Sequence, residues 1–571
     1  MDYYRNDRIT LSFVHTAVLF FFLSGSLWAG SIHVASDGND QATGSAEAPL
    51  KTVQAGLNKA QAGDTVFVSK GIYRERLVFP RDGEAGKPII LTGENGVIID
   101  GGTLVSGWEK VKGSGGDIYR IPYEGERPMN LTWNSKYILR IRDEFMAKGD
   151  MTTLRDGPMG WDSYEGKPYR SWDGVKAMWG CWQGYLYLGF GDSTVNPAEQ
   201  EITTTPDGKR GGATVTVDGR KFITVKGLTL RNAYHAVMIY NGSSDCVIED
   251  NDLIGGKNTV MIAGGPKGEP SRIVVTKNRC TLGYVHSLDP ADARHWFIWA
   301  AFKKNSDWDR TCISMKNFGS DVEISENHLF ENFNGVGNQK SGKRLTVHHN
   351  LIEYMADDGL EPDGEETEAH WHHNVVRNCN IQYRHKNIIG DGPMYVYDNW
   401  FVSRPGQKTG SNMGLYFFGG STTPAYIYHN TFIASRGVTV GAKNIQLGLP
   451  NVWMINNVFS CDEVFQDNKR LKIYPHFDYN YCEGDLSVPK SWWGKNNKLV
   501  KRERILDLEL INGKQENFVL LLNKRGVDLS KKWSSGGVVH LSLPGMQGGY
   551  YKNGKAHVGA KMQAGRGGDN R

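Results

Sequence analysis

The segments "VHHNLIE" (347–353) and "WHHNVVR" (371–377) are copies of one pattern, in which alternating apolar residues lead to an asparagine and a second apolar run. Successive copies are 27, 49, 23, 24, 25, 31 and 27 residues apart. Repeats of this length are typical of solenoids, whose units bury their apolar faces against their neighbours. The spacing of 49 indicates one or two repeats that carry an insertion. The pattern is centred on Asn251, Asn278, Asn327, Asn350, Asn374, Asn399, Asn430 and Asn457.

Each repeat is expected to consist of short strands and turns, because its apolar residues alternate with period two and show no helical period. Asparagine tolerates the left-handed turn conformation, and stacked amide side chains can hydrogen-bond from one repeat to the next. The repeat is too short for a β-propeller blade and lacks the leucine pattern of leucine-rich repeats. The sequence therefore predicts an all-β fold, a right-handed parallel β-helix with the asparagines aligned at one turn.

The regions outside the ladder suggest caps and insertions. Residues 30–105 are expected to form an N-terminal cap and the first coils, including a helix with Leu50, Val53, Leu57 and Ala60 on one face. This helix would cover strand edges that otherwise pair with other chains. Residues 106–215 are rich in Trp, Tyr and Gly and predict a β insertion. The main β-helix spans 216–460 with an insertion at 283–310, and 461–571 form C-terminal coils and a cap.

Composition and the N-terminus limit the possible functions. Lys and Arg total 66 against 62 Asp and Glu, a net charge of +4, which argues against a nucleic-acid binder. Arg5 and Arg8 precede an apolar run that ends near Ala29, so residues 1–29 are expected to be a cleaved signal peptide. The mature chain is then exported, with no membrane segment, and is expected to be a monomer. Its seven cysteines leave at least one unpaired, and most are expected to be small buried residues.

The asparagine ladder and the opening stretch "IHVASDGNDQATGSAEAPLKTVQAGLNKAQAGDTVFVSKGIYRERLVF" (32–79) carry a family resemblance. Together they resemble the exported bacterial β-helix repeat proteins of the pectate-lyase-like superfamily, over about 31–105 and 216–460. That superfamily includes polysaccharide lyases, glycoside hydrolases and phage tailspikes, so the resemblance implies the fold and does not select a substrate.

The stretch "DDGLEPDG" (357–364) holds four acids within seven residues. In a strand, Glu361 and Asp363 share the outward face, while Leu360 and Pro362 point inward. Counting from the ladder asparagines places equivalent residues of neighbouring coils beside them. One predicted outward row contains Lys316, Gln339, Asp363, Arg384 and Phe418, and the parallel row contains Ser314, Gly337, Glu361, Gln382 and Tyr416.

These rows suit a glycoside hydrolase that needs no cofactor. Glu361 and Asp363 would serve as acid and as base or nucleophile, with Asp358 as a third carboxylate. Arg384 and Lys316 would supply positive charge beside them. The amides and aromatic rings would bind the polysaccharide. The substrate-binding candidates are Gln339, Gln382, Tyr416 and Phe418, with Trp296 and Trp299 from the insertion, where Arg294 and His295 also lie.

Two other functions remain open. In a polysaccharide lyase, Asp357, Asp358 and Glu361 would bind Ca²⁺, as the resemblance to some β-helix pectate lyases implies. Lys316, Arg384 or Lys386 would then remove the substrate proton, although the more specific motifs of pectate lyases and polygalacturonases are absent. A non-catalytic glycan-binding solenoid would use the Trp- and Tyr-rich surfaces alone. The run "HWHHN" (370–374) has no partner set at zinc spacing in the sequence, so a zinc site is not expected.

Overall fold

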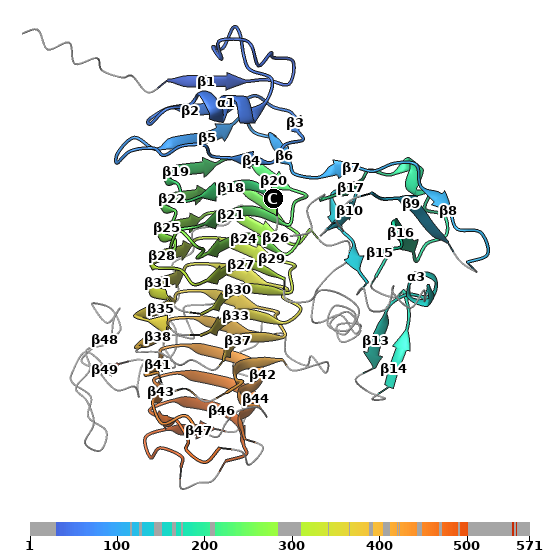
Figure 1. Cartoon of the computed structure of the whole chain (residues 1–571). Helices are drawn as coiled ribbons and strands as arrows, with labels where there is room; N and C mark the ends of the chain where they lie inside the picture. The colour runs from blue at the N-terminus through green and yellow to red at the C-terminus, as the bar shows by residue number, and fades with distance from the viewer. Residues whose placement is uncertain are drawn as a thin grey trace, which may run out of the picture.

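The computed structural model describes residues 30–500 with several gaps, of which 284–309 is the longest, and the pairs 551–552 and 555–556. The described chain forms a long stack of coils with a smaller β-rich unit beside its upper half (Figure 1). Each coil contributes strands to three columns, and within a column every strand pairs in parallel with the equivalent strand of the next coil. The predicted parallel β-helix is therefore confirmed.

The first column is a 14-stranded sheet that runs the full length of the stack (Figure 1). Its inward side chains, such as Val225, Ile248 and Val275, are fully buried, which explains the alternation seen in the sequence. The strands are β1 (Ser31–Val34), β2 (Thr65–Val68), β5 (Ile89–Gly93), β19 (Lys221–Lys226), β22 (Ser244–Glu249), β25 (Ser271–Thr276), β28 (Ser320–Ser325), β31 (Gly342–His348), β34 (Glu366–Thr367), β35 (Ala369–His372), β38 (Met394–Tyr397), β41 (Ala425–Tyr428), β43 (Val452–Ile455) and β45 (His476–Asp478).

The other two columns join into one 22-stranded sheet, because two long strands bend from one column into the other. These bending strands are β42 (Thr431–Val440) and β44 (Val458–Asp467). The second column, called the acid-bearing column below, holds β4 (Leu77–Val78), β18 (Ala213–Asp218), β21 (His235–Tyr240), β24 (Asn258–Ala263), β27 (Thr311–Lys316), β30 (Asn334–Gln339), β33 (Asp358–Asp363), β37 (Ile381–His385) and β40 (Met413–Phe417). The third column holds β3 (Ile72–Tyr73), β6 (Ile98–Asp100), β20 (Thr229–Arg231), β23 (Asp252–Ile254), β26 (Arg279–Thr281), β29 (His328–Phe330), β32 (Leu351–Glu353), β36 (Val375–Arg377), β39 (Trp400–Val402), β46 (Tyr481–Leu486) and β47 (Lys498–Val500).

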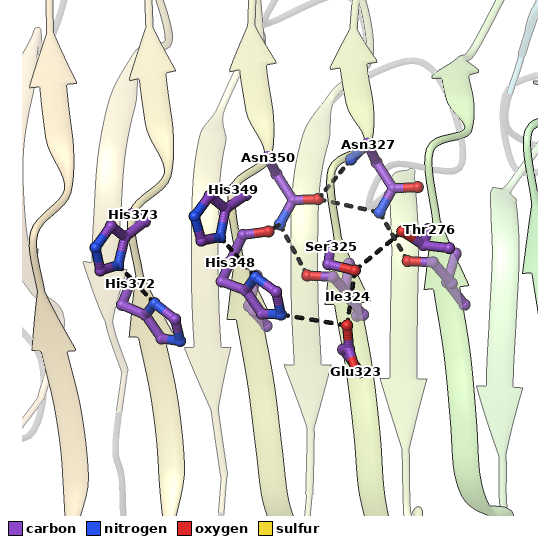
Figure 2. A network of polar contacts seen from close by, with 12 residues as sticks. Thr276, Glu323, Ile324, Ser325, Asn327, His348, His349, Asn350, His372 and His373 are labelled. Atoms are coloured by element: carbon purple, nitrogen blue, oxygen red, sulfur yellow. Dashed lines mark hydrogen bonds and ion pairs between the residues drawn. The ribbon is translucent and has the colours of Figure 1, made fainter. Parts of the chain in front are cut away.

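The asparagines form one continuous ladder at the turn between the first and third columns. In each step the Nδ2 of one asparagine donates to the Oδ1 of the next at 2.9–3.2 Å, as Figure 2 shows for Asn327 and Asn350. The amide also donates to a buried carbonyl, for example from Asn374 to Val347 at 2.9 Å. The ladder therefore satisfies backbone groups that the turn leaves unpaired inside the core.

Two details of the predicted ladder are corrected, and the spacing of 49 is assigned to the first of its two predicted alternatives. The left-handed conformation belongs to the residue before each asparagine, such as His349 (φ 57°) and His373 (φ 55°), since the asparagine itself must point inward along the stack. Asn278 bonds directly to Asn327, so the spacing of 49 is a single coil with an insertion. The ladder does not end at residue 460, because Asn480 and Asn497 continue it.

A short helix, α1 (Val53–Lys59), begins at Thr52, whose side chain accepts a hydrogen bond from the Ala55 amide. It lies next to β1 and β2 at the first end of the stack (Figure 1). All four residues of the face named from the sequence are at most 1% exposed, but only Val53 and Leu57 lie on α1: Leu50 precedes the helix and bridges to Val34, and Ala60 is the C-cap. Its role as a cap that blocks strand pairing stays a prediction.

The insertion between β6 and β18 forms separate sheets beside the stack, antiparallel except for the parallel pair β12–β15 (Figure 1). One of its cores includes Leu282, Phe333 and Ala356 of the β-helix, so it packs against the corners that precede the acid-bearing column. Its elements are β7 (Thr103–Leu104), β8 (Glu109–Lys110), β9 (Ile118–Pro122), β10 (Leu131–Trp133), β11 (Lys136–Tyr137), β12 (Leu139–Arg140), α3 (Thr152–Asp156), β13 (Met159–Asp162), β14 (Lys167–Arg170), β15 (Ala177–Trp182), β16 (Tyr185–Phe190), the 3-10 turn Pro197–Glu199 and β17 (Ile202–Thr204).

Several expectations concern segments at the ends of the chain. The signal peptide (1–29) and most of 501–571 lie outside the described residues, apart from the short strands β48 (Tyr551–Lys552) and β49 (Lys555–Ala556). All seven cysteines are free thiols, and six of them are buried. Within the described ranges, none of the helices has the length and apolar character needed to span a bilayer.

Candidate active site

The four acids of "DDGLEPDG" gather on β33 and the corner before it, and they are called the acid cluster below. Asp357 and Asp358 are 3% and 0% exposed, and Glu361 is 9% exposed. Asp363, at the end of β33, is half-buried. The prediction that Glu361 faces open solvent is therefore wrong, because neighbouring groups cover this outward position.

Two cations on the next coil hold the acid cluster together. Arg384 on β37 contacts Asp358 at 2.9 Å (Nε–Oδ1), Asp357 at 3.1 Å (Nη2–Oδ1) and Glu361 at 3.8 Å (Nη1–Oε1). Lys386 follows β37, and its Nζ lies 2.8 Å from Asp363 Oδ2 and 3.4 Å from Glu361 Oε1. Four carboxyl groups thus share two positive charges.

This imbalance changes the protonation of Glu361. Burial raises the pKa of Glu361, since a charged carboxylate loses its hydration inside the protein. Arg384 and Lys386 oppose the shift, whereas the charges of Asp357 and Asp363 reinforce it. The net result is a glutamate with a pKa above its usual range, which favours the protonated acid.

Asn334 also contacts this carboxyl group and was missed from the sequence. Its Nδ2 donates to Glu361 Oε2 at 3.1 Å, and its Oδ1 accepts from the Asp358 amide at 3.1 Å. The signal was available, because Asn334 precedes Asn350 by the same 16 residues that separate Asp358 from Asn374. Counting back from the ladder identifies both.

The predicted register is correct on one side of β33 and wrong on the other. Gly337 and Gln339 lie opposite Glu361 and Asp363, as expected. On the following coil, however, Leu360 pairs with Tyr383 and Asp363 with Lys386, so Arg384 lies beside Glu361. The similarity of "IQYR" to "LEPD" suggested a register that is two residues off, because the inward position of Leu360 is filled by Tyr383 and not by Ile381.

This shift moves one predicted ligand out of the site. Gln382 is fully buried, and its Nε2 donates to the Cys379 carbonyl at 3.0 Å and to Ser403 Oγ. The Gln382 amide therefore forms its hydrogen bonds inside the core. It does not reach the acid cluster to bind a sugar hydroxyl, as the sequence had suggested. Lys316 lies at the end of β27, two coils from Asp363, with an exposed side chain, and is not brought into the acid cluster.

Of the four aromatic residues predicted to bind substrate, two lie near Arg384 and two fall outside the described residues. Tyr416 pairs in register with Arg384, and the guanidinium lies 5.7 Å from its ring centre and 5.8 Å from that of Phe418. Both rings are half-buried on the same face as Glu361. Trp296 and Trp299, with Arg294 and His295, lie outside the described residues, and so does the side chain of Gln339.

The acid cluster does not fit the calcium site of the lyase hypothesis. The three carboxylates assigned to Ca²⁺ are Asp357, Asp358 and Glu361, and Arg384 contacts all three. Its guanidinium occupies the position in which a bound cation would neutralise them. Among the described residues, no group of three or more His, Cys, Asp or Glu side chains is arranged to hold a metal ion.

Comparisons with known proteins agree with the fold. A family model described as "Right handed beta helix region" matches residues 213–432, and one described as "Protein of unknown function (DUF1565)" matches residues 36–129. The solved complex of XylC with xylose superimposes with a TM-score of 0.58 over 83% of this chain and 86% of that one, at 16% identity. A likeness at this identity concerns the fold.

Two curated relatives share shorter segments. Pectate lyase PEL9 of Emericella nidulans is 34% identical over 90 residues, which is 15% of this chain and 22% of that protein. The uncharacterized protein YwoF of Bacillus subtilis is 32% identical over 108 residues, or 18% and 23% of the two chains. The chain thus matches less than a quarter of the length of either relative. The ladder, the three columns and these matches together identify the fold as a right-handed parallel β-helix, and residues 213–432 are similar to the family described as a right-handed β-helix region.

Proposed function

We propose that the chain is an exported glycoside hydrolase that cleaves a polysaccharide with Glu361 as proton donor and Asp363 as base or nucleophile. The observation that carries the proposal is the burial of Glu361 among three other carboxyl groups that share two cations, a setting that raises its pKa, with Asp363 on the same strand face. Glycoside hydrolysis needs one carboxylic acid that is protonated and one carboxylate that is not. A buried, crowded glutamate beside a lysine-paired aspartate supplies this asymmetry.

The proton donor has a defined setting. Asn334 holds one oxygen of Glu361, and Lys386 lies nearest the other. Residues two apart on one strand face have side-chain stems roughly 6.5–7 Å apart, a spacing that long side chains can narrow or widen. Both stereochemical outcomes of glycoside hydrolysis are therefore compatible with the pair.

The surroundings suit a sugar chain. Tyr416 and Phe418 present half-buried rings, on which the apolar face of a pyranose can pack. Arg384 and Lys386 add positive charge, which favours a substrate that carries carboxylate or sulfate groups. PEL9 is named a pectate lyase and XylC was solved with xylose, and both descriptions are compatible with a carbohydrate substrate.

Elimination is supported less well than hydrolysis. A lyase needs a base that removes the proton next to the uronate carboxyl group, and Lys386 and Arg384 are the basic residues at the acid cluster. Burial by itself would lower the pKa of Lys386, but Glu361 and Asp363 reverse the effect and the pKa is raised. Arginine is always protonated in proteins. Neither side chain is prepared to accept a proton at neutral pH.

The test is a panel of neutral and anionic polysaccharides incubated with the purified chain. Release of reducing ends is expected without the ultraviolet absorbance that an unsaturated uronate product gives. Pretreatment with a calcium chelator should leave the rate unchanged, because Arg384 already neutralises the carboxylates. A chelator-sensitive rise in absorbance would establish the calcium-dependent lyase instead. Saturable binding of a glycan without either product would establish the non-catalytic solenoid.

A further inference from the structure

Two pairs of consecutive histidines lie on the first column, away from the acid cluster on the second (Figure 2). His348 closes β31 and His349 follows it, while His372 closes β35 and His373 follows it. Because the second histidine of each pair has a left-handed φ, its ring turns back toward the first. The two Nδ1 atoms are 2.7 Å apart in both pairs.

The four rings form two stacks along the β-helix axis. His348 lies 5.0 Å from His372 with an interplanar angle of 4°, and His349 lies 5.0 Å from His373 with an angle of 8°. His372 stacks in turn on Tyr397 at 4.7 Å. Packing therefore fixes the ring planes, and the two pairs present the same arrangement of nitrogens on successive coils.

One histidine of each pair has a carboxylate near its Nε2. His348 Nε2 lies 3.3 Å from Glu323 Oε1, and His373 Nε2 lies 3.4 Å from Asp398 Oδ2. A carboxylate in this position favours the tautomer with the proton on Nε2, which leaves the Nδ1 lone pair directed at the other ring.

We propose that each histidine pair chelates one divalent transition-metal ion through its two Nδ1 atoms, with copper(II) and nickel(II) preferred to zinc(II). At metal–nitrogen distances of about 2.0–2.1 Å, a separation of 2.7 Å gives an angle of about 80–85° at the metal. That angle fits neighbouring positions of a tetragonal site. A tetrahedral zinc site would need nitrogens about 3.3 Å apart at the same bond lengths.

Metal binding also requires further ligands for each ion and a new position for the Nδ1 proton of the metal-free pair. Since the described residues hold no cluster of three or more metal-binding side chains, water completes the coordination of each ion. In the metal-free pair, one ring donates its Nδ1 proton to the other. On binding, that proton moves through solvent to the Nε2 of the same ring, and both Nδ1 lone pairs bind the metal. No oxidation or reduction is involved.

The stacking distance predicts how the two pairs influence each other. Ions held by the two pairs would lie roughly 5 Å apart, well inside the Debye length of about 8 Å at physiological salt. Their repulsion is reduced by Glu323 and Asp398 but not removed. The second ion is therefore expected to bind at least about tenfold more weakly than the first.

The proposal is tested by calorimetric titration of the metal-depleted full chain, without a polyhistidine tag, with copper(II), nickel(II) and zinc(II). Two copper ions should bind in two steps, with nickel weaker and zinc weakest. The paramagnetic resonance spectrum of copper at low loading should show an axial signal coupled to two nitrogens. A spectrum without nitrogen coupling, or zinc binding tighter than copper, would overturn the proposal without any variant.

Aromatic substitutions separate chelation from stacking. His348→Phe with His349→Phe should leave one copper ion, His372→Phe with His373→Phe should also leave one, and all four together should leave none. His370→Phe is the matched control, because His370 lies on the same strand as His372 and packs against Tyr395 with ring centres 4.8 Å apart, and this variant should keep both ions. Retention of copper by the fourfold variant would place the binding elsewhere and refute the site.

Discussion

Glu353 and Glu361 are two buried glutamates on consecutive strands, 7% and 9% exposed, yet their acidities shift in opposite directions. Glu353 accepts hydrogen bonds from His328 Nε2 at 2.8 Å and Arg377 Nε at 2.6 Å. Burial alone would raise the pKa of Glu353, but these two partners lower it. For Glu361, burial prevails and the pKa is raised.

Glu353 and Glu361 differ in the number of carboxyl groups that share their positively charged partners. Arg377 and His328 serve Glu353, whereas Arg384 and Lys386 are divided among all four members of the acid cluster. A buried carboxylate with partners of its own is typical of a structural ion pair. A buried carboxylate that shares its partners with other acids, as Glu361 does, has a raised pKa. Such perturbed pKa values are more frequent at functional sites.

The largest expected effect is on catalysis. Glu361→Gln should reduce the turnover of the glycan identified by the polysaccharide panel by roughly 10²-fold or more, the scale of a lost general acid. Glu353→Gln should leave turnover within about twofold, because Glu353 joins its own coil to the coils before and after it and lies outside the acid cluster. Initial rates of both variants, measured at equal folded protein, decide the comparison. Equal losses in both variants would show that the acid cluster has no special role.

Asp363→Asn tests the second carboxyl group separately. Loss of the base or nucleophile should also reduce turnover by roughly 10²-fold. Its ion pair with Lys386 is half-exposed, so the stability of the chain should change little. If turnover of this variant stays within about threefold of the original chain, the proposed partner of Glu361 must be another residue.

The free energy of unfolding should depend more on Glu353 than on Glu361, which is the reverse of the order expected for turnover. Glu353→Gln removes a charge that two hydrogen bonds stabilise, and it should lower the free energy of unfolding by about 1–2 kcal/mol at neutral pH. A loss of about 1 kcal/mol is expected rather than 2, because the Arg377 side chain is 42% exposed and solvent screens its charge. Glu361→Gln should cost nothing at the same pH. Urea midpoints at unchanged slope measure both effects.

Sequence periodicity was sufficient to predict the fold, because each coil repeats the same inward residues and the same asparagine. The ladder was cut short at residue 460 because Asn480 is surrounded by aromatic residues in "DYNYC" rather than by aliphatic ones. Packing accounts for one of these tyrosines, since Tyr479 lies against a buried cluster of Tyr397, Tyr426, Tyr428 and Ile455. Packed rings there replace the alternating polar residues expected at a solvent-facing position.

The acid cluster could be predicted only in part. Period-two geometry placed Glu361 and Asp363 on one face, but the neighbour of each depends on the length of a turn. Asn350 precedes Asp358 by eight residues, whereas Asn374 precedes the paired Ile381 by seven. Equal turns would place His385 beside Glu361, and the similarity of "IQYR" to "LEPD" placed Gln382 there, whereas the observed pairing brings Arg384 to this position. The burial of Glu361 was also unpredictable, because it depends on segments distant in the sequence.

The smallest expected effect is a difference in the pH dependence of stability. The pKa of Glu353 is lowered from 4.5 in the folded state, so its stabilisation is present above pH 4.5 and is lost as the pH falls through the lowered value. The deficit of Glu353→Gln should therefore shrink on acidification. The pKa of Glu361 is raised from 4.5, so the folded state holds the extra proton, and its contribution weakens as the pH rises from 4.5 through the raised value. Glu361→Gln should accordingly gain stability relative to the original chain over that window.

Each unit of pKa difference corresponds to about 1.4 kcal/mol, so midpoints must be compared at several pH values on both sides of pH 4.5. Opposite slopes for the two variants would confirm that the glutamates differ in the way their partners suggest. A deficit that grows with pH in both variants would mean that Arg384 and Lys386 stabilise the charged form of Glu361 after all. In that case Glu361 could not be the proton donor, and the acid of the proposed hydrolase would have to be sought among the other members of the acid cluster.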